Sequence, residues 1–88
     1  MTETPENRLK RLKMRSWRRG TKEMDLILGP FADSELAKLA ADALDLYESL
    51  LAENDQDLYQ WMSGQVAAPT EHAQITDEIR NFHKILTN

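Results

Sequence analysis

Apolar residues recur at helical spacing along most of the chain. In the clearest series, leucines, alanines and a tyrosine follow the i, i+3, i+4, i+7 rule: Leu36, Leu39, Ala40, Ala43, Leu44, Tyr47, Leu50 and Leu51. We expect one helix that begins at Asp33 or Ser34 and continues through this series. No segment alternates apolar and polar residues with the period of two that a half-buried strand requires. The pattern therefore predicts an all-α protein.

Two helices are expected before this series. Thr4 is a typical N-cap, and Pro5 suits the first helical position because its missing N–H is not needed there. This helix should run to about Trp17, with a thin apolar side made of Leu9, Leu12 and Ser16.

Gly20 then interrupts the pattern. A second short helix is predicted from Thr21 to Leu28, ended by Gly29 as a C-cap and Pro30 beyond it. With Gly20 at its N-cap, Glu23 would be the third helical residue and could bond back to the cap N–H.

Two more helices should complete the fold. Residues 54–57 read as a turn and cap, followed by a short helix, "DLYQWMS", that Gly64 ends. Thr70 should cap the last helix, whose apolar stripe is Ile75, Ile79, Phe82 and Leu86. The expected architecture is a single small compact bundle of about five helices, several of them short. It forms one domain over residues 1–88, with residues 1–5 as a disordered tail.

Composition narrows the function classes. The chain has 88 residues and no cysteine, which excludes disulfides, thiolate metal sites and thiol catalysis. No apolar run is long enough for a membrane span, so we expect no membrane insertion. The polar start lacks a signal-type or transit-type extension, which favours a bacterial cytoplasmic protein, or a mitochondrial matrix protein if the source is eukaryotic.

The net charge of −4 hides an asymmetry between the two parts of the chain. Eight basic and no acidic residues lie between Arg8 and Lys22, whereas thirteen acids and three bases follow. Four arginines share one side of the first helix by spacings of three and four: Arg8, Arg11, Arg15 and Arg18. This face could steer a partner, bind nucleic acid as a regulatory module, or simply be solvated. The acidic remainder of the chain would repel phosphate, which argues against nucleic acid.

Signs of catalysis are weak. His72 and His83 lie eleven residues apart near one face of the last helix, too far for chelation within one turn, and no third ligand is evident. We expect them to be packed or surface histidines with a structural role only. No glycine-rich loop follows a strand, and no nucleophile has a recognisable setting. The sequence predicts a non-enzyme without a metal or a stably bound cofactor.

The stretch Arg19-Gly20-x-x-Glu23 leaves two interpretations open, a structural turn or a docking surface. A cation just before a helix N-terminus opposes the helix dipole, so Arg19 is expected to be exposed. Gly20 would let another backbone approach closely, and Arg19 and Glu23 could supply directed polar contacts to it.

These residues also carry a resemblance. "RRGTKEMDLILGPF", followed by "DQDLYQWM", resembles the succinate dehydrogenase flavinylation factors, the bacterial SdhE proteins and their mitochondrial counterparts. The first family block is met by Arg19, Gly20, Glu23, Met24, Asp25, Pro30 and Phe31. The second block is met by Asp55, Asp57, Leu58 and Trp61. Gln56 departs from the proline of many members, which changes the stiffness of that turn.

The resemblance implies a function that composition could not show. Members bind the flavoprotein subunit of succinate dehydrogenase, and in some bacteria that of fumarate reductase, and promote covalent attachment of FAD to that client. The chain would act without catalysing the reaction, as a monomer when free and without binding nucleic acid. A generic helical adaptor for another protein is the remaining alternative.

The resemblance and the charge pattern together define the expected partner-binding residues. They are Arg19, Gly20, Glu23, Arg8, Arg11, Arg15, Arg18, Asp25, Pro30 and Phe31. Replacing Arg19, Gly20 or Glu23 is expected to damage client flavinylation more than it damages the fold.

Overall fold

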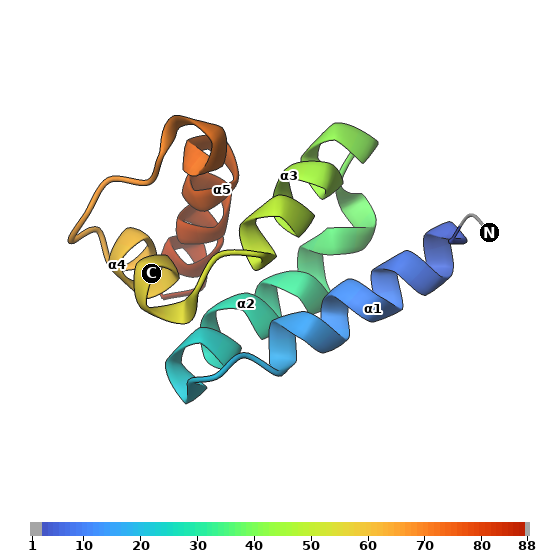
Figure 1. Ribbon diagram of the computed structural model, residues 1–88, viewed down its shortest axis with the longest axis horizontal. Coiled ribbons are helices and arrows are strands. Elements are labelled where there is room, and N and C mark those ends of the chain that lie inside the picture. Colours follow the sequence, from blue (N-terminus) through green and yellow to red (C-terminus); the bar gives the residue numbers. More distant parts are fainter. Residues whose placement is uncertain (1–2, 88) are drawn as a thin grey trace.

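The chain folds into helices joined by short connections (Figure 1). The computed structural model describes residues 3–87, with side chains up to residue 84. Its elements are α1 (Pro5–Trp17), α2 (Lys22–Glu35), the 3-10 helix η1 (Leu36–Lys38), α3 (Ala41–Leu51), α4 (Asp55–Met62) and α5 (Thr70–Thr87). The described residues contain no strand, and the predicted all-α bundle of five α-helices is confirmed.

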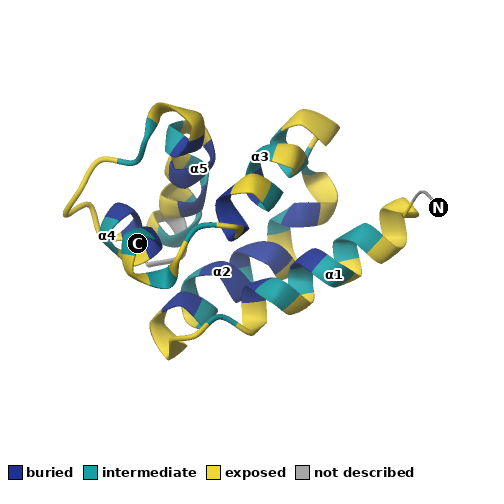
Figure 2. Cartoon of the chain, in the orientation of Figure 1, coloured by how far each residue is buried: buried dark blue, intermediate teal, exposed yellow. Residues whose placement is uncertain are grey.

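Helices α1 and α2 lie side by side, α3 runs back across them, and α4 and α5 cover the other end (Figure 1). The buried residues come from every α-helix and lie where the helices face one another (Figure 2). At the centre, Phe31 stacks on Tyr47 with ring centroids 5.7 Å apart and meets Phe82 edge-on at 5.6 Å. The core therefore joins α2, α3 and α5 through aromatic contacts.

The first helix follows its local signals. The Thr4 hydroxyl accepts a hydrogen bond from the Asn7 N–H at 3.2 Å, and the helix ends at Trp17, as predicted. Residues 1 and 2 lie outside the described part of the chain. Of the other residues expected in a tail, Glu3 pairs with Arg11, Thr4 caps α1 and Pro5 is the first residue of that helix.

The predicted end of the second helix is wrong, because α2 continues through Gly29 and Pro30 to Glu35. Gly29 is buried, and a Cβ added there would overlap the indole ring of Trp17. Its role is therefore to let Trp17 pack against the helix backbone. Pro30 has no N–H to donate within the helix. Nearby, the His83 Nε2 bonds the Ile27 carbonyl at 2.6 Å and so ties α5 to this part of α2.

The long helix predicted from residue 33 or 34 to residue 51 is also wrong. The chain leaves helical geometry at Leu39 and Ala40, where ψ is 140° and 162°, and α3 begins only at Ala41. The reversal lets Leu36 and Leu51 enter the same core.

The last two helices agree with most of their local signals. The Asn54 side chain caps α4 by accepting from the Asp57 N–H at 2.9 Å, and Gly64, with φ of 83°, follows its end. Thr70, expected as a cap, is the first residue of α5. The Leu86 side chain lies outside the described residues.

Both histidines pack against neighbouring groups, as predicted. His72 is buried, with its ring 5.6 Å from that of Trp61, and His83 is half-buried beside Phe82.

Tyr47 is a buried titratable group at the centre of the fold. Its hydroxyl lies 2.6 Å from Ser16 Oγ, and Ser16 donates its own proton to the Leu12 carbonyl at 2.7 Å, so Tyr47 is the donor to Ser16. Burial raises the pKa of Tyr47 to about 12, against the smaller lowering effects of Ser16 and Arg19. The neutral phenol is thus the form that the folded chain favours.

This pKa predicts a loss of stability at high pH. The unfolded chain releases the Tyr47 proton near pH 10, whereas the folded chain holds it to about 12. The contribution of Tyr47 to the free energy of unfolding is fully present below pH 10 and is lost as the pH rises to 12. At 1.4 kcal/mol per pKa unit, this loss is roughly 2–3 kcal/mol. Urea unfolding measures the free energy of unfolding of the wild type and of Tyr47→Phe at pH values across this range. This free energy should fall more steeply with pH in the wild type than in Tyr47→Phe. Parallel curves would contradict the assignment.

Candidate functional site

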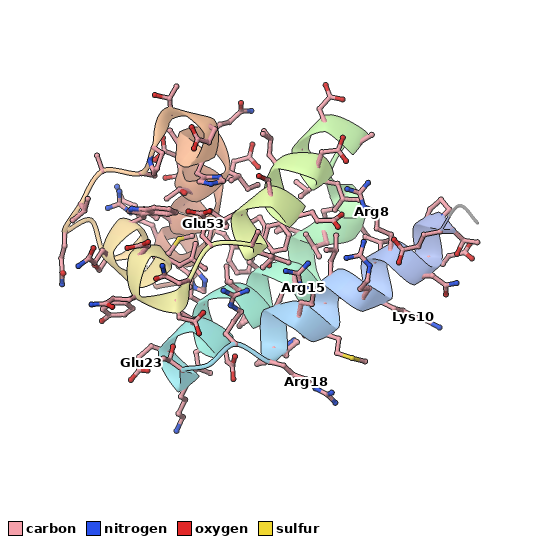
Figure 3. All side chains as sticks on the ribbon, viewed as in Figure 1. Arg8, Lys10, Arg15, Arg18, Glu23 and Glu53 are labelled. Atoms are coloured by element: carbon pink, nitrogen blue, oxygen red, sulfur yellow. The ribbon has the colours of Figure 1, made fainter. Side chains whose placement is uncertain are left out.

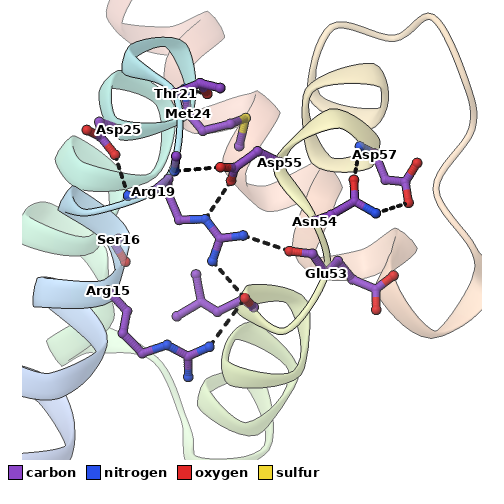
Figure 4. Close-up of polar contacts among 12 residues, drawn as sticks. Arg15, Ser16, Arg19, Thr21, Met24, Asp25, Glu53, Asn54, Asp55 and Asp57 are labelled. Atoms are coloured by element: carbon purple, nitrogen blue, oxygen red, sulfur yellow. Dashed lines mark hydrogen bonds and ion pairs between the residues drawn. The ribbon is translucent and has the colours of Figure 1, made fainter.

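Arg19 occupies a pocket between the end of α3 and the start of α4. Its Nε donates to Asp55 Oδ1 at 2.7 Å, Nη1 to the Leu51 carbonyl at 2.7 Å, and Nη2 to the Glu53 carbonyl at 2.6 Å (Figure 4). The side chain is 11% exposed, so the prediction that Arg19 is exposed is wrong. The physical reason is the C-terminus of α3, whose carbonyls lack partners within the helix and carry the negative end of its dipole.

Asp55 joins this pocket to the turn before α2. Its Oδ2 accepts the Gly20 N–H at 2.6 Å while Oδ1 pairs with Arg19 (Figure 4). Asp55 is also the first residue of α4, where a carboxylate is favourable to the helix dipole. Asp55 therefore connects the two sequence blocks, which lie 35 residues apart at this bond.

Gly20 is required by this close approach. A Cβ added to it would lie 2.8 Å from Asp55 Oδ2, and this carboxylate is already held by Arg19 through Oδ1 and by the Gly20 N–H through Oδ2. The prediction that Gly20 caps α2 is wrong. Thr21 takes that place, and its side chain accepts a hydrogen bond from the Met24 N–H at 3.3 Å. The glycine serves a contact within the fold.

Glu23 is consequently the second residue of α2, and its predicted bond back to the cap is wrong. Within the described residues it forms no hydrogen bond or ion pair, and its side chain is exposed. Arg19 and Glu23 thus have opposite roles, since the arginine closes the corner from inside and the glutamate faces solvent.

A hollow of about 460 Å³ lies beside Glu23. It is lined by Thr21, Glu23, Asp55, Gln56, Tyr59, Gln60 and Gln65. Asp55 is already compensated by Arg19, so Glu23 is the uncompensated charge of this lining. We name the hollow and Glu23 the corner site. Its acceptors suit a cationic or N–H-bearing group of a partner.

Sequence reasoning missed the part of this site that α4 supplies. Tyr59 is 43% exposed, and Gln56 and Gln60 follow the i, i+4 spacing on the polar side of α4. This spacing, on the side of α4 opposite the buried Leu58 and Trp61, was the sequence signal that could have indicated an exposed polar face on α4. It did not reveal that the polar side of α4 faces the start of α2, because this depends on tertiary packing.

The arginine face predicted on α1 is divided by the structure. Arg8 pairs with Asp45 at 2.6 Å and with Glu48 at 3.0 Å, both on α3. Arg11 pairs with Glu48 at 3.0 Å and with Glu3 at 2.8 Å, and its hydrogen bond lowers the pKa of Glu3.

The remaining two arginines of that face differ from each other. Arg15 donates to the Leu51 carbonyl at 3.3 Å, whereas Arg18 is exposed and forms no bond within the described residues. Figure 3 shows Arg8 and Arg15 directed toward α3, and Lys10 and Arg18 directed away from it. Most of the predicted face therefore fixes α1 to α3, which leaves Arg18 as its free cation.

The other expected partner-binding residues lie mostly within the fold. Phe31 is 2% exposed in the aromatic core, and Pro30 is half-buried within α2. Asp25 is half-buried and accepts the Arg19 N–H at 2.6 Å. Of the first sequence block, the structure leaves Gly20 and Glu23 exposed at the surface.

The described residues also bear on metal binding and on membranes. No group of three or more histidine, aspartate or glutamate side chains in this part of the chain is arranged to hold a metal ion. None of the described helices combines the length and apolarity needed to cross a membrane.

A family model described as "Flavinator of succinate dehydrogenase" matches residues 10–83, a range that contains both sequence blocks and the corner site. The chain belongs to this family. Relatives of this flavinator family occur in bacteria and in mitochondria. "FAD assembly factor SdhE" of Legionella pneumophila (strain Lens) is 36% identical over 76 residues, covering 86% of this chain and 96% of that protein.

A mitochondrial relative is similarly close. "Succinate dehydrogenase assembly factor 2, mitochondrial" of Schizosaccharomyces pombe (strain 972 / ATCC 24843) is 37% identical over 82 residues. The match covers 91% of this chain and 59% of that longer protein. The chain thus spans nearly all of the bacterial relative and more than half of the mitochondrial one.

Proposed function

We propose that this chain is an assembly factor that binds the flavoprotein subunit of succinate dehydrogenase and promotes covalent attachment of FAD to it. Membership of the flavinator family and the names of its relatives support this role. The corner site is the observation that assigns this proposed role to particular residues. There, an exposed and unpaired Glu23 is held beside a hollow by the network of Arg19 and Asp55.

The mechanism that suits this geometry is stabilisation of one client conformation. Arg19 and Asp55 fix the start of α2 against α4, so Glu23 is presented in one place before the client arrives. A factor shifts a conformational equilibrium only by binding one state better than another. In this proposal, Glu23 bonds a basic or N–H group that the client presents in its flavinylation-competent state. The new covalent bond forms within the client, and no residue of this chain exchanges protons or electrons.

The finer points of this role are proposals as well. We infer that the chain is a monomer when free, acts in the bacterial cytoplasm and holds no cofactor of its own. We also propose the fumarate reductase flavoprotein as a second client, and in-gel fluorescence of its covalent flavin can test this. A nucleic-acid-binding role has less support, because Arg8 and Arg11, which would contact phosphate, are paired with carboxylates.

The test compares Glu23→Gln with Glu6→Gln in a strain that lacks the gene. Both glutamates are exposed second residues of helices capped by threonine, so the control matches helix position and charge change. In-gel fluorescence of covalent flavin on the flavoprotein subunit is the readout. We expect Glu6→Gln to restore the signal and Glu23→Gln to restore about a tenth of it or less, as loss of a charge-assisted hydrogen bond of about 1.5–3 kcal/mol implies.

Two outcomes would contradict the proposal at different levels. Undiminished covalent flavin in the deletion strain would remove the assembly role. Full restoration by Glu23→Gln would leave the role in place and remove Glu23 from it.

A further inference from the structure

The outer face of the α1–α2 pair exposes three large apolar side chains. Met14 is 54% exposed, Trp17 40% and Leu26 53%. Most large apolar residues of the described chain are buried, so three on one pair of helices form a distinct surface feature.

Helical spacing and one contact between the helices place these three side chains at neighbouring positions. Met14 and Trp17 are neighbours on α1 by the i, i+3 spacing, and Leu26 stands in the same relation to Gly29 on α2. The Trp17 ring lies directly over Gly29, so it bridges the two helices between Met14 and Leu26. The Trp17 Nε1 donates to Asp33 Oδ2 at 3.2 Å, which fixes the ring.

Basic residues surround this apolar strip. Lys10 and Arg18 lie four residues on either side of Met14, and Lys22 lies four residues before Leu26. All three are exposed and form no ion pair with the described residues. Figure 3 shows Lys10 and Arg18 directed away from the body of the molecule.

We propose that this α1–α2 outer face, made of Lys10, Met14, Trp17, Arg18, Lys22 and Leu26, docks an acidic protein surface with an apolar centre. The identity of the partner rests on the proposed function: the acidic surface that docks on this face is part of the flavoprotein client. An immobilised, partly exposed tryptophan within a polar rim is typical of the residues that dominate binding energy at protein interfaces. Leu26 lies three residues after Glu23 on α2, so one client surface can cover this face and the corner site.

A protein partner fits the face better than an anionic bilayer does. Asp33 bonds Trp17 at the strip, and a protein partner can set its carboxylates opposite the basic residues and a neutral group opposite Asp33. An anionic bilayer would present negative charge to Asp33 as well. The same bond occupies the indole N–H that an interfacial tryptophan would offer to headgroups.

The experiment measures binding of the full chain to the purified flavoprotein subunit that lacks covalent flavin. Met14→Glu and Leu26→Glu place a carboxylate on the strip without touching the buried Trp17–Gly29 contact. Val66→Glu is the matched control, because Val66 is 47% exposed in the connection between α4 and α5. We expect each strip variant to weaken the Kd at least tenfold, Val66→Glu to change it less than twofold, and added salt to weaken wild-type binding.

Other outcomes separate this inference from the proposed function. Normal affinity of both strip variants, together with weakened Glu23→Gln, would overturn the outer face alone. A wild-type chain that does not bind the flavoprotein would overturn the proposed function and the partner with it. Strip-dependent sedimentation with phosphatidylglycerol vesicles, with flavoprotein binding unchanged in the strip variants, would assign the face to a membrane instead.

Discussion

Replacing Arg19 with alanine is expected to lower the free energy of unfolding by about 3–5 kcal/mol, the range for breaking a largely buried ion pair. The substitution leaves Asp55, 17% exposed, without its cation, removes the donor to the Glu53 carbonyl and leaves the Leu51 carbonyl with only the longer bond from Arg15. For a domain of this size that is a large part of a total of roughly 5–10 kcal/mol. Urea unfolding followed by circular dichroism measures the change.

Arg18→Ala is the matched control for this prediction. Arg18 is the adjacent arginine, exposed and without a bond to the described residues, so its removal should change stability by less than about 0.5 kcal/mol. Arg19→Lys should fall between the two, since one ammonium cannot reach Asp55 and both carbonyls with the geometry of the guanidinium fork. Equal stability of Arg18→Ala and Arg19→Ala would show that the pocket contributes little.

Phe31→Ala is expected to have a comparable effect, about 3–5 kcal/mol, because a buried aromatic ring is lost and a cavity remains. Phe31 is 2% exposed and contacts the rings of Tyr47 and Phe82, so α2, α3 and α5 all lose contacts. Unfolding in urea is again the measurement, and Tyr59→Ala is the control, since Tyr59 is 43% exposed. A stable Phe31→Ala variant with impaired client binding would instead support the sequence-based assignment of Phe31 to the interface.

The contacts behind these two predictions give most residues of the first sequence block a role in stability. Arg19, Asp25 and Phe31 hold the fold, and Gly20 permits the approach of Asp55. We therefore revise the expectation that changes at Arg19 and Gly20 damage client flavinylation more than the fold, and we expect both to impair folding and flavinylation together. Glu23 is the member of the Arg19-Gly20-x-x-Glu23 corner that can separate function from stability.

Local signals in the sequence determined several elements correctly. Thr4 and Pro5 mark the start of α1, and Asn54 and Gly64 bracket α4, because caps and positive φ values depend on residues within one turn. Helical spacing of apolar residues, with no alternating segment, fixed the all-α class. The two sequence blocks also identified the family and the region of the corner site.

Only the tertiary structure decided where α2 ends, where the long apolar series breaks and which way Arg19 points. Gly29 stays within a helix because Trp17, twelve residues away, packs on it, and the Arg19 acceptors lie 32 to 36 residues away. A helix terminus or a buried cation of this kind is stabilised by partners that are distant in sequence. Neighbouring residues alone cannot specify it, because its energy comes from contacts that exist only once the chain has folded.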